Sequence, residues 1–169
     1  MGLEGPKSQE EIQEEYVALW QSVYDEVATK LNAHSEFGIY NEEHAMLAGI
    51  EKIEMKDESG EVIGYIDFKV LKKDSLYINY SETKEGYLNQ GVYKAILARI
   101  LIEHPNIKVV FGELMDFNQI KYIEGLNQGM NIEEAMRNTP AYKAASTLGF
   151  STIKIRGDRL ICFRDLFEV

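Results

Sequence analysis

A strand, a glycine turn and a helix follow one another in the middle of this sequence. Residues 76–81 (LYINYS) are rich in aromatic and β-branched side chains, which is typical of a strand. A polar turn with Gly91 leads into an apolar segment, Val92 to Glu103, that is typical of a buried helix and ends before Pro105. The first N–H groups of a helix lack partners within it and attract anions, so this unit predicts a site for a phosphate-bearing ligand.

Further helices and strands are indicated on both sides of this unit. Ser8 and Glu11 form a capping box that predicts a long amphipathic helix ending near Asn32, and no clear strand pattern precedes it. Thr139 and Pro140 begin another helix, which Gly149 ends. The region between residues 32 and 45 is interpreted as a polar loop. The remaining strands are expected at 45–55, 62–71, 109–115, 151–156 and 159–167.

This order of elements predicts one α/β (α+β) domain with a mixed, mostly antiparallel sheet flanked by helices. The 169 residues, of which 45% are hydrophobic, suffice for a complete core. Residues 1–7 are expected to be a loose leader. Residues 117–138 are expected to be helical in parts, with breaks at Gly125 and Gly129 and a capping box at Asn131.

Composition excludes several classes of protein. A formal charge of −10 argues against a surface for nucleic acid or anionic membrane, because both need clustered Lys and Arg. No apolar run approaches the ~20 residues of a membrane helix, and residues 1–9 lack a signal-peptide pattern, so a cytoplasmic location is expected. Cys162 is the single cysteine and is expected to be a buried thiol. The three histidines share no metal-ligand spacing, so no metal site is expected.

Three local features resemble the GNAT acyltransferase superfamily. Residues 87–93 (YLNQGVY) match the spacing of its pyrophosphate loop, and Asn118 follows a strand as an Asn often does in that family. Residues 141–150 (AYKAASTLGF) look like its last helix and the Gly-Phe that follows. The resemblance covers roughly residues 45–169. It implies a GNAT-like sheet, acetyl-CoA or another acyl-CoA as cofactor, and an amine as acceptor.

The loop is a degenerate form of the family's motif. Gly91 stands where the motif has glycine, but Leu88 replaces a long polar residue and Tyr93 replaces a second small one. Phosphate contacts through backbone N–H groups do not depend on side-chain identity. The resemblance therefore still implies cofactor contacts, and they are expected at Gln90, Gly91, Val92, Tyr93, Lys94 and Asn118.

Residues 119–137 form an insertion relative to the family. They are interpreted as a lid, a substrate wall or a contact between two copies of the chain. A solvent-facing decoration is the competing interpretation.

Candidate catalytic residues follow from the resemblance and from the strand positions. Many members place a tyrosine where this chain has Ala145, and Tyr142 lies one turn earlier on the same helix. Glu113, within a predicted central strand, is a candidate base that would deprotonate the attacking ammonium, and Glu82 is a second. The competing interpretation of Glu113 is a strand-end carboxylate paired with Lys or Arg. Four tyrosines either line an acceptor pocket or are half-buried strand residues: Tyr77, Tyr80, Tyr87 and Tyr93.

The sequence thus leads to three hypotheses about function. The first is an acyl-CoA-dependent N-acyltransferase that transfers an acetyl group directly to a small-molecule or peptide amine. The second is a GNAT-like module that binds a ligand or regulates without catalysis. The third is an interaction protein without a cofactor, which would use the long first helix or the insertion as its interface.

Overall fold

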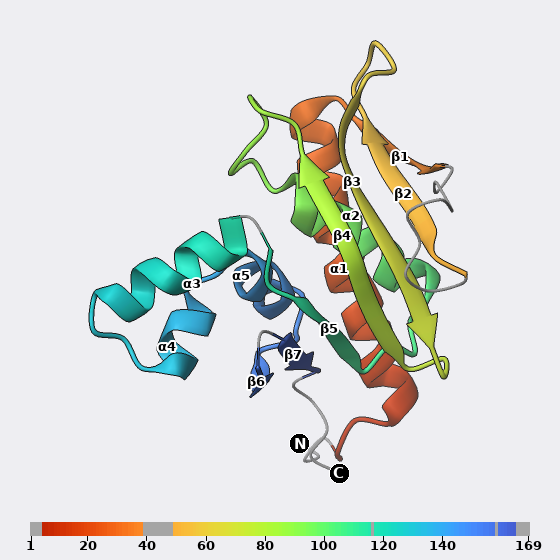
Figure 1. Cartoon of the computed structure of the whole chain (residues 1–169). Helices are drawn as coiled ribbons and strands as arrows, with labels where there is room; N and C mark the ends of the chain where they lie inside the picture. The colour runs from red at the N-terminus through yellow and green to blue at the C-terminus, as the bar shows by residue number, and fades with distance from the viewer. Residues whose placement is uncertain (1–4, 39–48, 116, 158, 165–169) are drawn as a thin grey trace.

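The computed structural model describes residues 5–38, 49–115, 117–157 and 159–164. Five helices and seven strands occur in these residues (Figure 1). The helices are α1 (Gln9–Leu31), α2 (Val92–Glu103), α3 (Phe117–Asn127), α4 (Ile132–Arg137) and α5 (Pro140–Thr147). The strands are β1 (His34–Gly38), β2 (Glu51–Lys56), β3 (Val62–Leu71), β4 (Ser75–Thr83), β5 (Val109–Glu113), β6 (Thr152–Arg156) and β7 (Arg159–Phe163).

All the strands belong to one sheet in the order β1-β2-β3-β4-β5-β7-β6. Neighbouring strands are antiparallel except β4 and β5, which are parallel because α2 carries the chain back between them. The mixed, mostly antiparallel sheet expected from the sequence is therefore confirmed. Among the described residues, no helix is long and apolar enough to span a membrane.

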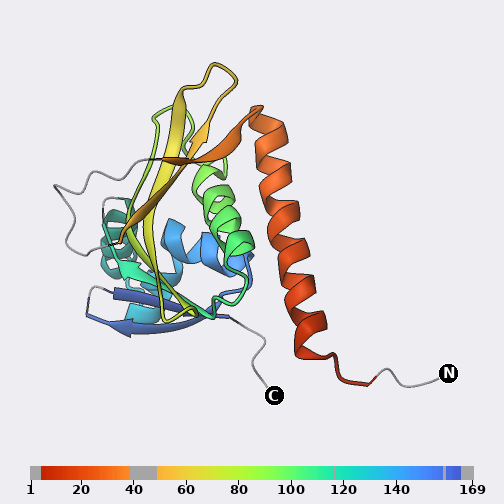
Figure 2. The ribbon, with the colours of Figure 1, turned by 90° about the vertical axis from the view of Figure 1, so that its right-hand side faces the viewer.

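Helices α1, α2 and α5 pack on one face of the sheet, as the edge-on view in Figure 2 shows for α1 and α2. The centre of this layer is Trp20 of α1, which is completely buried and lies 6.4 Å from the ring of Phe150. Its indole N–H donates to the carbonyl of Leu148 at 2.8 Å. A satisfied N–H allows so large a side chain to be buried at little polar cost.

The helix ends lie where the sequence predicts them. The Ser8 hydroxyl accepts a hydrogen bond from the N–H of Glu11 at 3.1 Å, and Asn32 ends α1 in the left-handed conformation. The Thr139 hydroxyl accepts from the N–H of Tyr142 at 3.2 Å at the start of α5. Local capping chemistry is enough to set these boundaries.

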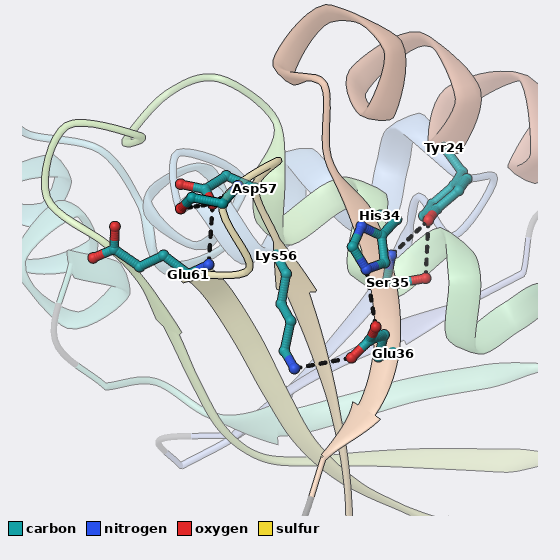
Figure 3. Close-up of polar contacts among 8 residues, drawn as sticks. Tyr24, His34, Ser35, Glu36, Lys56, Asp57 and Glu61 are labelled. Carbon is teal, nitrogen blue, oxygen red and sulfur yellow. Dashed lines mark hydrogen bonds and ion pairs between the residues drawn. The ribbon is translucent and has the colours of Figure 1, made fainter.

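The polar loop expected after α1 is wrong in part, because residues 34–38 form β1 at the edge of the sheet. Figure 3 shows why a polar sequence suits this strand. Glu36 lies between His34, at 3.0 Å, and Lys56 of β2, at 2.9 Å, and Lys56 lowers the pKa of Glu36 more than His34 does. An edge strand needs one partner strand rather than an apolar sequence, so its local pattern is weak.

The insertion is helical, but one of its expected breaks is wrong. Gly125 lies inside α3 and is buried, and a Cβ there would come within 3.1 Å of the Ala135 backbone in α4. The glycine thus permits a close approach of two helices. The chain does turn at Gly129, where φ is +90°.

Two strand boundaries also differ from expectation. The strand expected at 45–55 begins at Glu51, and residues 45–48 lie outside the described residues. The last strand ends at Phe163, and 165–167 lie outside them. Of the expected leader, residues 5–7 have no regular secondary structure.

Candidate functional site

The sheet opens between its two parallel strands. Pairing of β4 with β5 runs from Ser75 opposite Val109 to Ile78 opposite Gly112 and then stops. Strand β4 continues to Thr83, and in the described part of the chain it pairs there only with β3 (Figure 1). The end of β4 therefore has an edge that β5 does not cover, and such an edge can receive an extended ligand.

A bulge marks the point where the two strands part. Asp67 of β3 lies opposite Tyr80, whereas the next residue, Phe68, lies opposite Ile78. Strand β4 therefore has one extra residue, Asn79, directly after its last pair with β5. Bulges bend a strand and redirect its side chains, so this one helps to turn β4 away from β5.

The chain passes from the open end of β4 to the N-terminus of α2. Gly91 precedes the helix with a φ of +84°, and no side chain among the described residues caps the helix there. A Cβ at Gly91 would lie 3.6 Å from Cε of Lys94, so this cationic side chain folds back beside the turn. The Gln90 amide donates to the carbonyl of Gly86 at 3.0 Å and closes the turn. An uncapped helix start beside a lysine favours an anion.

Gly91 also has a purely structural role. Its positive φ disfavours any residue with a side chain, and a Cβ would lie 3.1 Å from Cγ2 of Val27 in α1. The glycine is thus required where α1 approaches the start of α2. Its presence supports the fold independently of any ligand.

Tyr93, in the first turn of α2, is half-buried and packs against the core. Burial raises the pKa of its phenol, and the Cys162 thiol in β7 adds to the shift. Leu88 in the turn is 37% exposed.

The sheet face away from α1, α2 and α5 has a different character. Cross-strand pairing places Glu54 beside Tyr65 beside Glu82, and Lys52 beside Asp67 beside Tyr80. Residues two apart on a strand share a face, so both rows lie on one surface. We call it the open face, and its residues are Lys52, Glu54, Tyr65, Asp67, Tyr80 and Glu82.

Asp67 is the most unusual residue of the open face. It is only 5% exposed, and its Oδ1 accepts no hydrogen bond within the described residues. The Lys52 ammonium lies 3.8 Å from Oδ1, which is close enough for an ion pair but too far for a hydrogen bond. Burial raises the pKa of the Asp67 carboxyl and Lys52 opposes that shift, while Glu54 adds to it.

The neighbouring Tyr65 links the two rows. Its hydroxyl donates to Oε2 of Glu82 at 3.0 Å, and its ring lies 4.2 Å below the Lys52 ammonium and 6.1 Å from the Tyr80 ring. Burial raises the pKa of Tyr65, and the Glu82 carboxylate raises it further. The tyrosine therefore stays protonated and holds Glu82 at the open end of β4.

The structure separates the other candidate residues. Glu113 ends β5 with a side chain more than half exposed, 3.7 Å from Arg159. Asn118 accepts a hydrogen bond from the N–H of Ala141 at 2.7 Å, so its side chain caps the start of α5. The Tyr142 hydroxyl donates to the carbonyl of Ser151 at 3.1 Å and accepts from Arg137.

Sequence reasoning missed Asp67 and Tyr65. Asp67 stands in an otherwise apolar and aromatic run, GYIDFKV, and an acidic residue in such a run is the signal that could have identified it. Of the four tyrosines considered, Tyr80 lies on the open face, whereas Tyr93 lies on the helix-covered side. Only the register of β2, β3 and β4 shows which side chains are neighbours.

No family model and no curated protein matches the chain. Solved structures that resemble it include a GNAT family acetyltransferase from Elizabethkingia anophelis with acetyl-CoA bound, at 10% identity over 80% of this chain and 99% of that chain, with a TM-score of 0.44. Another is a GNAT family acetyltransferase from Staphylococcus aureus Mu50, at 15% identity over 92% and 94%, with a TM-score of 0.40. A third is nourseothricin acetyltransferase, at 10% identity over 78% and 95%, with a TM-score of 0.43.

The similarity is too low to carry an argument about activity. The fold class rests on the strand order and helix positions described above.

Proposed function

We propose that this protein is an acyl-CoA-dependent N-acyltransferase that acetylates a small-molecule or peptide amine by direct transfer. The observation that carries this proposal is the parting of β4 from β5 after Ile78, together with the turn that leads from the end of β4 to the uncapped start of α2. This arrangement supplies an unpaired strand edge and an anion-attracting helix end within one connected segment.

In the proposed complex, the pyrophosphate of acyl-CoA lies on the N–H groups of residues 91–94, beside the Lys94 ammonium. The pantetheine arm follows the edge of β4 beyond Ile78. A backbone N–H of β4 polarises the thioester carbonyl, as an oxyanion hole does. The amine approaches from the open face, where Tyr65 and Tyr80 provide aromatic walls.

Glu82 is the proposed base, because Tyr65 holds it at the open end of β4. It removes a proton from the acceptor ammonium, directly or through water, and the free amine attacks the carbonyl carbon. The carbon–sulfur bond then breaks, and the thiolate of CoA takes up a proton from water, or from Tyr142 once its hydroxyl has left the Ser151 carbonyl. Glu113 is the second candidate base, from the end of β5. Ala145 is buried and has no proton to give.

A module that binds without catalysis is the second candidate, and Tyr93 favours it. The half-buried phenol occupies the position where the family has a small residue. A ligand that reaches β7 would have to displace it. Ala145 stands where many family members have a tyrosine, so α5 lacks the usual general acid. This also favours a module that binds without catalysis.

An interaction protein is the third candidate, and α3 favours it. Its four most exposed apolar side chains are Phe117, Ile120, Ile123 and Leu126, each at least 38% exposed. They would suit the contact between two copies that is one interpretation of the insertion. Light scattering on the protein and on an Ile120→Glu/Ile123→Glu variant tests this, and equal monomeric masses would exclude a dimer through α3.

Calorimetric titration with acetyl-CoA tests the leading proposal, followed by turnover measurements on a panel of primary amines. We expect binding, release of free thiol, and an acetylated amine. Absence of heat and of a thermal shift at millimolar acetyl-CoA would refute acyl-CoA binding. Binding without turnover would select the non-catalytic module.

A Tyr93→Ala variant sharpens this test. If the phenol crowds the ligand, the variant binds acetyl-CoA about tenfold more tightly than the natural protein. Phe37→Ala is the control, because it also removes an aromatic ring but lies on β1, which β2 and β3 separate from β4. Unchanged affinity in Tyr93→Ala would mean that Tyr93 does not restrict the site.

A further inference from the structure

The open face has an excess of negative charge that its own residues do not balance. Glu54, Asp67 and Glu82 carry three carboxylates, and Lys52 is the cation beside Asp67. The nearby Lys56 is paired with Glu36 at 2.9 Å. Lys69, on the same face of β3, extends toward Gly49, where a Cβ would lie 3.7 Å from its ammonium. With Lys69 counted as well, the three carboxylates and two ammonium groups leave a formal excess of one negative charge.

The burial of Asp67 is more specific evidence for a ligand than the net charge of the open face is. More than nine-tenths of this residue is buried, and one of its carboxylate oxygens accepts no hydrogen bond in the described part of the chain. A buried acceptor without a donor costs free energy that the fold does not recover. Such a group calls for an explanation, and a ligand that supplies the missing donor is one.

The surroundings of Asp67 suit an ammonium group. The Lys52 ammonium already lies 4.2 Å from the centre of the Tyr65 ring, so carboxylate and aromatic face meet at the same place. Cations of this kind are attracted by aromatic faces as well as by carboxylates. No cluster of three metal-ligating side chains occurs among the described residues, which disfavours a metal ion as the cation.

We propose that the open face binds a dication, a diamine or polyamine, with one ammonium at Asp67 and the other at Glu82. This inference rests on the proposed function in one respect. The amine beside Glu82, the proposed base, is the one that is acetylated. The binding of the dication itself does not need acyl transfer. The Asp67 end would position the acceptor and select its length.

The register of the strands sets that length. Glu82 lies opposite Tyr65, and Asp67 is two residues further along the same strand. The Cα atoms of diagonal neighbours of this kind are about 7–8 Å apart, which is roughly the distance between the two nitrogens of a diamine with four or five methylene groups. Tyr65 lies between the two carboxylates, and both of them raise the pKa of its phenol. A flexible chain between two ammonium groups would therefore lie along the Tyr65 ring.

Calorimetry without acyl-CoA tests this inference, with 1,4-diaminobutane and butylamine titrated in separate experiments at low ionic strength. We expect the diamine to bind at least about tenfold more tightly than the monoamine, because only it engages both carboxylates. An Asp67→Asn variant, nearly identical in shape, should bring the two affinities to within about twofold. Glu103→Gln on α2 is the control for net charge and should leave the ratio unchanged.

Two results would overturn the inference. One is equal affinity of diamine and monoamine for the natural protein, and the other is an unchanged ratio in Asp67→Asn. Circular dichroism checks that this variant folds, and Glu82→Gln supplies a second variant that should also lower the ratio. Diamine binding without acetyl-CoA binding would refute the proposed function and leave the dication site intact. Acetyl-CoA binding without diamine preference would do the reverse.

Discussion

The two faces of the sheet differ in the kind of side chain that they bury. The face under α1, α2 and α5 is filled with apolar side chains around Trp20, whose one polar atom is satisfied. The open face carries tyrosines and charges, and its most buried residue is Asp67, a carboxylate with an unsatisfied oxygen. Apolar burial stabilises the fold, whereas a buried charge with incomplete contacts weakens it. The contrast indicates that the first face holds the molecule together and the second is shaped for a ligand.

The largest effect should follow from damage to the helix-covered face. Trp20→Ala is expected to lower the free energy of unfolding by about 3–5 kcal/mol, because it leaves a cavity and an unpaired Leu148 carbonyl. Urea denaturation measures the loss. Leu19→Ala, on the same helix but 38% exposed, is the control and should cost far less. Similar losses for the two variants would contradict the view that Trp20 centres the core.

On the open face, the largest effect should be on activity rather than stability. Glu82→Gln is expected to lower kcat about 10²–10⁴-fold, because an amide cannot accept the proton of the ammonium. Steady-state kinetics with an amine identified in the panel measures it. Glu113→Gln is the comparison, since that carboxylate lies exposed beside Arg159 and should change kcat less. A larger loss in Glu113→Gln would assign the base to β5 instead.

Close packing predicts a moderate effect at Gly64 of β3. A Cβ there would lie 2.5 Å from Cγ1 of Val92, so Gly64→Ala must displace the start of α2. The expected cost is about 1–3 kcal/mol, measured by thermal or urea unfolding. Gly5→Ala, where a Cβ has nothing within 4 Å, should be neutral. A neutral Gly64→Ala would show that α2 moves freely against the sheet.

The smallest effect on stability should come from Asp67→Asn. Because burial raises the pKa of Asp67, the native state binds its proton more tightly than the unfolded state does. Stability therefore falls as the pH rises from the ordinary carboxyl pKa of about 4 through the raised native value. The variant should lack this decrease and be as stable as the natural protein, or more stable by about 1 kcal/mol, at pH 7.

Urea denaturation of both proteins between pH 4 and pH 8 measures this difference. Glu36 has a lowered pKa and gives a slope of the opposite sign in both proteins, so the comparison cancels it. A variant that is less stable than the natural protein at pH 7 would show that the Lys52 ion pair outweighs the burial of Asp67.

Much of the fold could be predicted because its signals are local. The Ser8 cap, the Thr139–Pro140 start of α5 and the apolar run of α2 each act within a few residues. Strand β1 could not be predicted, since within the described residues it pairs only with β2, whose partner residues lie 14 to 22 positions further along the chain. The helix break expected at Gly125 was wrong for a similar reason. Gly125 lies within α3 because α4 packs closely against it.

The candidate site likewise has features that the sequence predicts and features that only the tertiary structure shows. The turn at Gly91 was found from its sequence, although its glycine is also required by the approach of Val27. The sheet opening beside it was a consequence of the pairing of β4 with β5. Asp67 stands out in the sequence as an acidic residue in an apolar and aromatic run, but only the tertiary structure shows that it is buried beside Lys52 and Tyr65.

The sequence by itself determined the order of helices and strands, the mixed sheet and the anion-attracting start of α2, since these depend on periodicity, caps and backbone geometry. The tertiary structure alone decided where β4 leaves β5, which face each side chain occupies, and that Asp67 is buried beside Lys52 and Tyr65. The physical reason is that strand register and burial arise from contacts between residues far apart in the chain, where a shift of one residue would exchange the two faces.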